Sequence, residues 1–383
     1  MFIIDQLGSG GAEKSLTSLL PLLNYSLYDV DLIIMARGGI YEKYVPSQVN
    51  IINYSLYGKS RIDRIRKQLH QVNFSYQLRR SPKRHGAETH WRTMNGAVKP
   101  LERSYDVAIA YQQGLPTFFV ATKVNAKTKI AWVNADIFAA GYNMDYCRQF
   151  YDKMDAVVPV SLKLKDLLTE RAPWISKKLY CIYDIINPDV IKQLAQETVD
   201  DLPATEDEDI SIVTVGRLSK PKNHLLAVET ARVLKDKGIK FRWYFVGEGE
   251  MRPVIENKIK EAGLEQNVVL LGLKENPYPY MARADVYVQT SSFEGFGLTI
   301  AEAKILQKPV VSTDFDIVYD QIQDGKNGLI AQMTPEDVAE KIMKVLSDAG
   351  LRESIITELS KESNTTTITE PEKFNRLIRT QNN

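Results

Sequence analysis

Cysteine and histidine are scarce in this 383-residue chain, and each scarcity excludes a class of protein. Two cysteines, Cys147 and Cys181, exclude a disulfide scaffold and a cysteine-rich metal cluster, and they favour a reducing, cytoplasmic location. The four histidines show neither metal-ligand spacing nor a Ser-His-Asp or Cys-His arrangement. Apolar runs are short, and none approaches the ~20 residues of a membrane-spanning helix. We therefore expect a cytoplasmic protein with no metal centre.

The chain does contain a regular alternation of short apolar runs with helical patterns. Most runs are continuously apolar, which is typical of parallel strands buried on both faces. Alternation on this scale predicts parallel sheets with helices on both sides. The predicted strands, after a first apolar run at 2–4, are 30–35, 107–111, 129–133, 156–160, 210–215, 241–246, 268–271, 286–290 and 310–313.

An acidic stretch, Asp200–Asp209, has Leu202 as its only large apolar residue and indicates a surface linker. We therefore predict an α/β fold of two Rossmann-like domains that face a cleft, where the carboxyl ends of the strands would bind ligands. The predicted boundaries are 1–185 for the first domain, 186–208 for the linker and 209–367 for the second domain. A helix at about 368–383 is expected to pack back on the first domain.

The net charge of +1 hides a basic block. Between Lys59 and Arg103, twelve Lys or Arg stand against three Asp or Glu, and the stretch RIDRIRKQLHQVNFSYQL has helical spacing of its apolar residues. One interpretation is a solvated amphipathic helix followed by a polar loop that exposes His85 and His90. The other is a surface that docks on an anionic membrane. Nucleic-acid binding is disfavoured because no DNA- or RNA-binding motif accompanies the block.

A glycine-rich turn, DQLGSGGAEKSL, follows the first apolar run. A dinucleotide-binding fingerprint would need a small residue where this chain has Glu13, because helix and strand must pack closely there. A carboxylate at this position would also repel a pyrophosphate. The turn therefore predicts a flexible loop whose backbone at Gly10 and Gly11 can approach a ligand closely, with a plain strand–helix turn as the alternative.

The most specific signal is SSFEGFGLTIAEAK, at 291–304, between a predicted strand and a predicted helix. Free amides at a helix start favour anions, and Gly295 and Gly297 let a phosphate come close. Glu294 and Glu302 are eight positions apart, and carboxylates accept hydrogen bonds from sugar hydroxyls. This pattern favours a loop that holds phosphate on its amides, ribose on Glu302 and another sugar on Glu294.

A second signal, VGRLSKPKNH, starts at the end of strand 210–215. Arg217 and Lys222 stand at the expected ligand edge, where two cations suit a diphosphate leaving group. Lys220 is interpreted as an ordinary surface residue.

These stretches carry a resemblance to a known family. EGFGLTIAE, GRLSKPKN and the early GGAE are similar to motifs of the family 4 glycosyltransferases of the GT-B fold, including members that build capsule and lipid-linked polysaccharides. The resemblance implies a retaining, metal-independent hexosyl transfer from a nucleotide-diphosphate sugar, most often a UDP-sugar, with no cofactor. The acceptor would be a glycan or a polyprenyl-diphosphate-linked saccharide, and the enzyme would be cytoplasmic or peripheral on the inner membrane face.

The resemblance also assigns roles by position. Arg217, Lys222 and Glu294 would be catalytic, the two cations on the leaving diphosphate and Glu294 on the donor sugar. Gly216 would be a substrate-binding position, and Leu273 would meet the base. The remaining substrate-binding positions would be Gly10, Gly11, Gly295, Phe296, Gly297, Leu298, Thr299 and Glu302.

The resemblance makes the first domain the acceptor-binding domain and the second the donor-binding domain. One departure from the family pattern lies in the first domain. Many relatives have a histidine in a Trp–apolar–His pattern where this chain has Asn134. Asparagine can hydrogen-bond a sugar hydroxyl but cannot take a proton, so Asp136 is the candidate partner. Two alternatives stay open from the sequence, a nucleotide-sugar epimerase on the same fold and a non-catalytic nucleotide-sugar-binding subunit.

Overall fold

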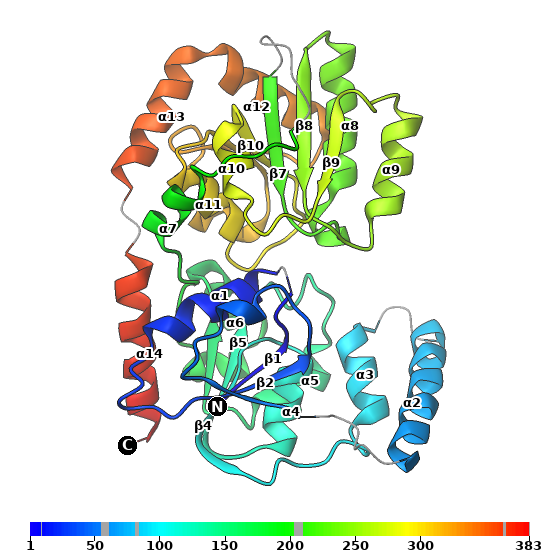
Figure 1. The fold of residues 1–383 in the computed structure, drawn as a ribbon, viewed down its shortest axis with the longest axis vertical. Helices are drawn as coiled ribbons and strands as arrows, with labels where there is room; N and C mark the ends of the chain where they lie inside the picture. Colours follow the sequence, from blue (N-terminus) through cyan, green and yellow to red (C-terminus); the bar gives the residue numbers. More distant parts are fainter. Residues whose placement is uncertain (9, 55–60, 81–83, 203–209, 363–364, 383) are drawn as a thin grey trace. The chain divides into compact units, whose positions relative to one another are not determined.

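The computed structural model describes residues 1–383 except 9, 55–60, 81–83, 203–209, 363–364 and 383 (Figure 1). The chain forms two compact units. Unit 1 contains Met1–Ile185 and Thr366–Asn383, and unit 2 is Ile186–Thr365. Most of the acidic stretch that suggested a linker lies outside the described residues. Within the predicted linker, Asn187 caps a short helix, α7 (Pro188–Leu194), because its side chain accepts the amide N–H groups of Asp189 and Val190.

Unit 1 is built on a six-stranded parallel sheet with the order β3-β2-β1-β4-β5-β6. The strands are β1 (Phe2–Gln6), β2 (Asp31–Ala36), β3 (Asn50–Ile52), β4 (Ser104–Ala110), β5 (Asn125–Val133) and β6 (Ala156–Pro159). The helices are α1 (Gly11–Leu19), α2 (Arg61–Arg80), α3 (Gly86–Met94), α4 (Leu115–Lys123), α5 (Met144–Tyr151), α6 (Leu162–Arg171) and α14 (Thr366–Asn382). Short 3-10 helices are η1 (Leu20–Leu22), η2 (Glu42–Tyr44) and η3 (Pro173–Lys178).

Unit 2 repeats this topology with a parallel sheet of order β12-β11-β10-β7-β8-β9. The strands are β7 (Ile210–Val215), β8 (Phe241–Val246), β9 (Val268–Gly272), β10 (Val286–Gln289), β11 (Val310–Thr313) and β12 (Leu329–Ala331). Besides α7, the helices are α8 (His224–Asp236), α9 (Arg252–Glu261), α10 (Tyr278–Arg283), α11 (Leu298–Ile305), α12 (Pro335–Ser347) and α13 (Ala349–Lys361). Two 3-10 helices are η4 (Lys220–Lys222) and η5 (Asp316–Asp320).

Both sheets confirm the prediction of Rossmann-like parallel folds. In each, the strand order reverses direction once, between β1 and β4 in unit 1 and between β10 and β7 in unit 2. In open α/β sheets, ligands bind outside the carboxyl ends of the strands at such a switch point. The fold therefore directs attention to the loops after β1 and β4 and to those after β7 and β10.

The core of unit 2 follows from continuous apolar strands. Trp243 and Phe245 of β8 are fully buried beside Ile212 of β7 and apolar residues of α8, α9 and α12. Burial of apolar surface on both faces of the strands is the main stabilising term, at about 25 cal/mol per Å².

The basic block forms a pair of helices, α2 and α3, in its described part (Figure 1). The prediction of a polar loop is wrong for 86–94. These residues form α3, which buries Trp91 and Met94. The expectation of solvated histidines is also wrong. The His85 ring stacks on Tyr142 with centroids 3.6 Å apart, and burial lowers the pKa of both His85 and His90.

Candidate active site of unit 2

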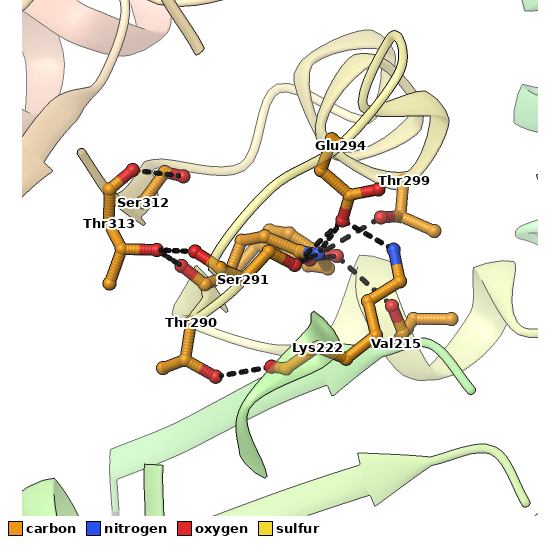
Figure 2. A network of polar contacts seen from close by, with 10 residues as sticks. Val215, Lys222, Thr290, Ser291, Glu294, Thr299, Ser312 and Thr313 are labelled. Carbon is orange, nitrogen blue, oxygen red and sulfur yellow. Dashed lines mark hydrogen bonds and ion pairs between the residues drawn. The ribbon is translucent and has the colours of Figure 1, made fainter. Parts of the chain in front are cut away.

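Glu294 lies in the loop after β10, and its carboxylate accepts hydrogen bonds from three side chains (Figure 2). One carboxylate oxygen, Oε1, accepts Lys222 Nζ at 2.5 Å, Ser291 Oγ at 2.6 Å and Gln289 Nε2 at 2.8 Å. Lys222 and Glu294 are mostly buried, with side chains 21% and 13% exposed. The structure thus brings together two predicted catalytic residues that are 72 positions apart in the chain.

The position of Lys222 follows from the turn that carries it. Asn223, directly after η4, adopts the left-handed backbone conformation with a φ of 48°, which asparagine tolerates better than most residues. Thr290 Oγ1 donates to the Lys222 carbonyl at 3.0 Å, and Ser292 N donates to the Pro221 carbonyl at 2.7 Å. Figure 2 shows the first of these bonds, and together the two tie the turn after β7 to the loop after β10 at the switch point.

The loop after β10 leads directly into the N-terminus of α11. Gly297, at φ +81°, is the N-cap of α11, and this left-handed conformation favours glycine. Leu298 and Thr299 begin the helix, and the amides of these first two positions are too early in α11 to bond a preceding helical carbonyl. The Phe296 carbonyl accepts Gln321 Nε2 at 3.0 Å, which fixes the loop from the other side. Glycine at 295 and 297 and the amides of 296–299 thus lie where the sequence predicted an anion site.

Glu302 lies one turn further along α11 and is 1% exposed. Tyr278 OH of α10 donates to Glu302 Oε1 at 3.5 Å. A buried carboxylate next to a phenol can accept hydroxyl hydrogen bonds from a ligand. Its role with ribose stays a prediction.

Arg217 is more exposed than the Lys222–Glu294 pair. Its side chain is 57% exposed and forms an ion pair with Glu250 at 3.7 Å. It still lies at the carboxyl end of β7, beside Gly216. There Gly247 packs so closely that a β-carbon on it would be 2.0 Å from the Gly216 carbonyl oxygen. Only glycine at 247 permits this approach of the two strand ends. Leu273 follows β9 at the same edge and is 41% exposed.

Next to Lys222, His224 is buried with neither ring nitrogen bonded to any described residue. Burial, and secondarily the charge of Lys222, lower the pKa of His224 to about 3. The imidazole is therefore neutral near pH 7. It packs edge-on to Phe245 with centroids 5.1 Å apart, which indicates a packing role.

In unit 1, the glycine turn lies between β1 and α1, as predicted, and β1 is one of the two strands at the switch point. Gly10 is the N-cap of α1, and Gly11 is its first residue. The Glu13 side chain folds against this turn, since a β-carbon on Gly10 would be 2.2 Å from Glu13 Oε2. Its carboxylate is in the first turn of α1, where the helix dipole favours negative charge.

The acceptor-side candidates follow β5. The backbone N–H of Asn134 donates to Gln113 Oε1 at 2.9 Å. The side-chain Oδ1 and Nδ2 of Asn134 are buried and are bonded to no described residue. Asp136 is 5% exposed, and its Oδ1 accepts the backbone N–H groups of Phe138 and Ala139 at 2.8 and 3.0 Å. One oxygen of Asp136 therefore holds a turn, and the acceptor roles of both residues stay predictions.

Sequence reasoning missed Gln289, Ser291 and Tyr287, which complete the Glu294 network. Tyr287 OH donates to Gln289 Oε1 at 2.5 Å, and Gln289 Nε2 donates to Ser291 Oγ at 2.7 Å. The available signal was a glutamine at the end of an apolar strand. A buried polar side chain there requires partners.

Known proteins resemble the chain in sequence. Residues 196–361 match the family model described as "Glycosyl transferases group 1". A Campylobacter jejuni relative, N-acetylgalactosamine-N,N'-diacetylbacillosaminyl-diphospho-undecaprenol 4-alpha-N-acetylgalactosaminyltransferase, is 28% identical over 92% of this chain and 91% of its own length. The poly(ribitol-phosphate) alpha-N-acetylglucosaminyltransferase of Staphylococcus aureus is 36% identical, over 39% of this chain and 32% of its own length.

Solved structures share the fold. A mutant of S. aureus TarM, in complex with fondaparinux, alpha-GlcNAc-glycerol and UDP, superposes with a TM-score of 0.67 and 16% identity, over 98% of this chain and 99% of its own. Anabaena Alr3699/HepE in complex with UDP and glucose superposes with a TM-score of 0.68 and 14% identity, over 99% of this chain and 98% of its own.

Two Rossmann-like sheets and these matches define the protein as a glycosyltransferase of the GT-B fold. The residues that match the group 1 glycosyltransferase model, 196–361, lie within unit 2, which carries the Lys222–Glu294 site.

Proposed function

We propose that the protein is a retaining family 4 glycosyltransferase that transfers a sugar from a UDP-sugar to a glycan or polyprenyl-diphosphate-linked saccharide in surface polysaccharide biosynthesis. The observation that carries the proposal is the Lys222–Glu294 pair at the switch point of unit 2, beside the start of α11. The names of the C. jejuni and S. aureus relatives support the acceptor class, and the UDP complexes of the structural neighbours support the nucleotide.

The site suits the charges that develop in glycosyl transfer. The donor sugar becomes positive, and the leaving diphosphate gains negative charge. Lys222 and Arg217, together with the α11 amides, would stabilise the diphosphate, Glu302 would hold the ribose, and Glu294 would accept a donor-sugar hydroxyl. Because these groups offset the charge, we expect no metal ion to be needed, so EDTA should leave the rate unchanged.

A panel of nucleotide sugars tests the function. The protein is incubated with each UDP- and GDP-sugar, with and without a lipid-linked saccharide acceptor, and products are followed by NMR. Transfer or slow hydrolysis that yields the α-anomer from an α-linked donor supports retaining transfer. A β-product contradicts retention, a new nucleotide sugar indicates an epimerase, and binding without turnover indicates a non-catalytic subunit.

For the basic block 59–103, we propose docking on an anionic membrane surface. In the described part of α2, Leu69, Val72 and Tyr76 lie on one helix face and are 65%, 70% and 53% exposed. Arg80 Nη1 donates to Tyr76 OH at 3.0 Å, so charge borders the apolar face. This arrangement is typical of helices that lie in a membrane interface. None of the helices in the described residues is long and apolar enough to cross a membrane.

Liposome sedimentation tests this docking. Neutralising Arg79, Arg80, Lys83 and Arg84 should release the protein from vesicles containing phosphatidylglycerol. A control neutralises four exposed lysines of unit 2, Lys235, Lys237, Lys260 and Lys344. Equal binding by both variants and the wild type would rule the membrane proposal out.

A further inference from the structure

Gln289 is a buried polar residue at the end of β10. It is 1% exposed and follows Val286 and Val288, which are fully buried. A carboxamide in such a place is unfavourable unless its hydrogen bonds are made. All the side-chain hydrogen bonds of Gln289 connect it, directly or through one residue, to the site.

Both ends of the carboxamide are engaged. Oε1 accepts Tyr287 OH at 2.5 Å and Thr299 Oγ1 at 3.4 Å. Because two hydroxyls donate to Oε1, the amide is oriented with Nε2 on the opposite side. Nε2 donates to Ser291 Oγ at 2.7 Å and to Glu294 Oε1 at 2.8 Å. The orientation of Gln289 is therefore set by β10 and the first turn of α11.

Glu294 is anchored by one oxygen only. Lys222, Ser291 and Gln289 all donate to Oε1, and no hydrogen bond from a described residue reaches Oε2 (Figure 2). Oε2 is also absent from the buried, unpartnered polar atoms of the described residues, so it retains contact with solvent. The carboxylate thus presents one fixed and one open oxygen.

The three donors differ in charge. Lys222 is a flexible cation that a diphosphate would attract, whereas Gln289 and Ser291 are neutral and are held by their own hydrogen bonds. We propose that Gln289 is a positioning residue that keeps Glu294 in place through Ser291 and Oε1 when Lys222 turns from Glu294 to the donor diphosphate. The inference rests on the proposed function, because it requires a diphosphate at Lys222 and a sugar hydroxyl at Glu294 Oε2.

Three substitutions separate this role from simple packing. Gln289→Leu removes both donor and acceptor with little change in volume. Gln289→Glu keeps an acceptor for Tyr287 and Thr299 but places a second carboxylate against Glu294. The matched control is Thr214→Val in the neighbouring β7. This buried hydroxyl donates to the Val288 carbonyl at 2.7 Å and accepts Trp243 Nε1 at 3.0 Å, without contact to Glu294.

The kinetic test uses the full chain and the donor identified by the nucleotide-sugar panel. Gln289→Leu should lower kcat about tenfold or more with a smaller change in the donor KM, and Thr214→Val should stay within about twofold of wild type. The kcat of Gln289→Glu, relative to that of the wild type, should rise as the pH is lowered from 8 to 6, because a protonated carboxyl can again donate to Glu294. In a Glu294→Gln background, Gln289→Leu should have little further effect. Independent, multiplying losses would overturn the inference.

A structural measurement keeps the inference separate from the proposed function. In a crystal structure of the Lys222→Met/Gln289→Leu double variant, in which the lysine no longer holds the carboxylate, Glu294 should leave Ser291 and adopt another rotamer, whereas Lys222→Met alone should keep Glu294 in place. If Glu294 stays in place in the double variant, Gln289 does not position it, whatever the activity. If the wild type turns over no donor, the proposed function fails, and the rotamer of Glu294 still decides the inference.

Discussion

Lys222 and Arg217 are the two cations at the carboxyl end of β7, but their surroundings differ. Lys222 is largely enclosed and bound to Glu294, while Arg217 is exposed and paired with Glu250. The sequence identified both as candidates because they share one short motif. It could not separate them, since the partner of each comes from a distant strand end.

We expect Lys222→Ala to lower kcat ~10²–10³-fold, because removal of a preorganised charge from such a site typically has this cost. Arg217→Ala should have an effect of the same order, because Arg217 is the second cation that follows the carboxyl end of β7. Lys220→Ala, an exposed lysine of the same turn, is the control and should change kcat less than about twofold. Steady-state kinetics with the donor measures all three. A normal rate for Lys222→Ala would contradict the assignment.

Asp184 is a buried carboxyl at the end of the first segment of unit 1. It is 4% exposed, and its Oδ1 finds no hydrogen-bond partner among the described residues. Burial raises the pKa of Asp184 to about 7, although Ser15 lowers it somewhat. The folded state therefore binds a proton between about pH 4 and pH 7 that the unfolded state releases. Stability should fall as the pH rises through this window.

Asp184→Asn should remove this dependence. One pKa unit corresponds to about 1.4 kcal/mol, so the gain in unfolding free energy at pH 8 should be on the order of 4 kcal/mol at most. Denaturant unfolding at pH 5 and pH 8 measures it. The unfolding free energy should change less between pH 5 and pH 8 in the variant than in the wild type. An unchanged difference would show that Asp184 does not titrate in this range.

Among the secondary-structure elements, strands were predicted better than helices. β7, β8 and β11 have the predicted bounds, because a continuous apolar run buried on both faces leaves few alternatives. The three-residue edge strands β3 and β12 were missed, since runs this short carry too little pattern. α3 was missed because its buried face includes the charged residue Glu88, which accepts the Asn143 amide N–H at the start of α5 and the Cys147 thiol of α5.

The α2–α3 pair contains two stacked histidines that should respond to pH. His70 and His90 have ring centroids 5.1 Å apart, and His70 Nε2 lies 2.6 Å from Thr93 Oγ1. Burial, and secondarily His70, lower the pKa of His90 to about 4. The unfolded helices bind more protons between pH 6.5 and 4, so stability of the pair should fall as the pH falls through this window.

Hydrogen exchange, corrected for intrinsic rates, should show loss of protection in 68–80 and 86–94 at pH 5 relative to pH 7.5. His90→Phe keeps an aromatic ring in the stack and removes the titrating group, so its protection should depend less on pH. Peptides of α12 serve as the internal reference. Identical behaviour of the variant and the wild type would assign the effect to other groups.

For the whole molecule, the notable feature is that unit 1 is discontinuous in sequence. α14 follows unit 2 in the chain but belongs to unit 1. Phe374 of α14 stacks on Phe2 with centroids 6.1 Å apart and lies 6.2 Å from Trp132, and Glu370 Oε2 accepts the Tyr183 amide at 2.8 Å. The last helix therefore completes the core of the first unit.

Phe374→Ala should destabilise unit 1 by ~3–5 kcal/mol, the usual cost of truncating a buried phenylalanine. Ile368→Ala, in the same helix but 63% exposed, should change stability by less than ~0.5 kcal/mol. Hydrogen exchange should show faster opening in β1, β5 and α14 of the Phe374 variant, with the core of unit 2 unaffected. Equal loss of protection in both units would mean that they unfold together.

The sequence by itself determined the parallel α/β class, most strand positions and the motifs at the strand ends, because these depend on local apolar runs and short spacings. Only the tertiary structure decided which residues meet. It placed Lys222, Gln289 and Ser291 on one oxygen of Glu294. Such contacts depend on the order in which strands pair, and a sequence pattern does not specify that order.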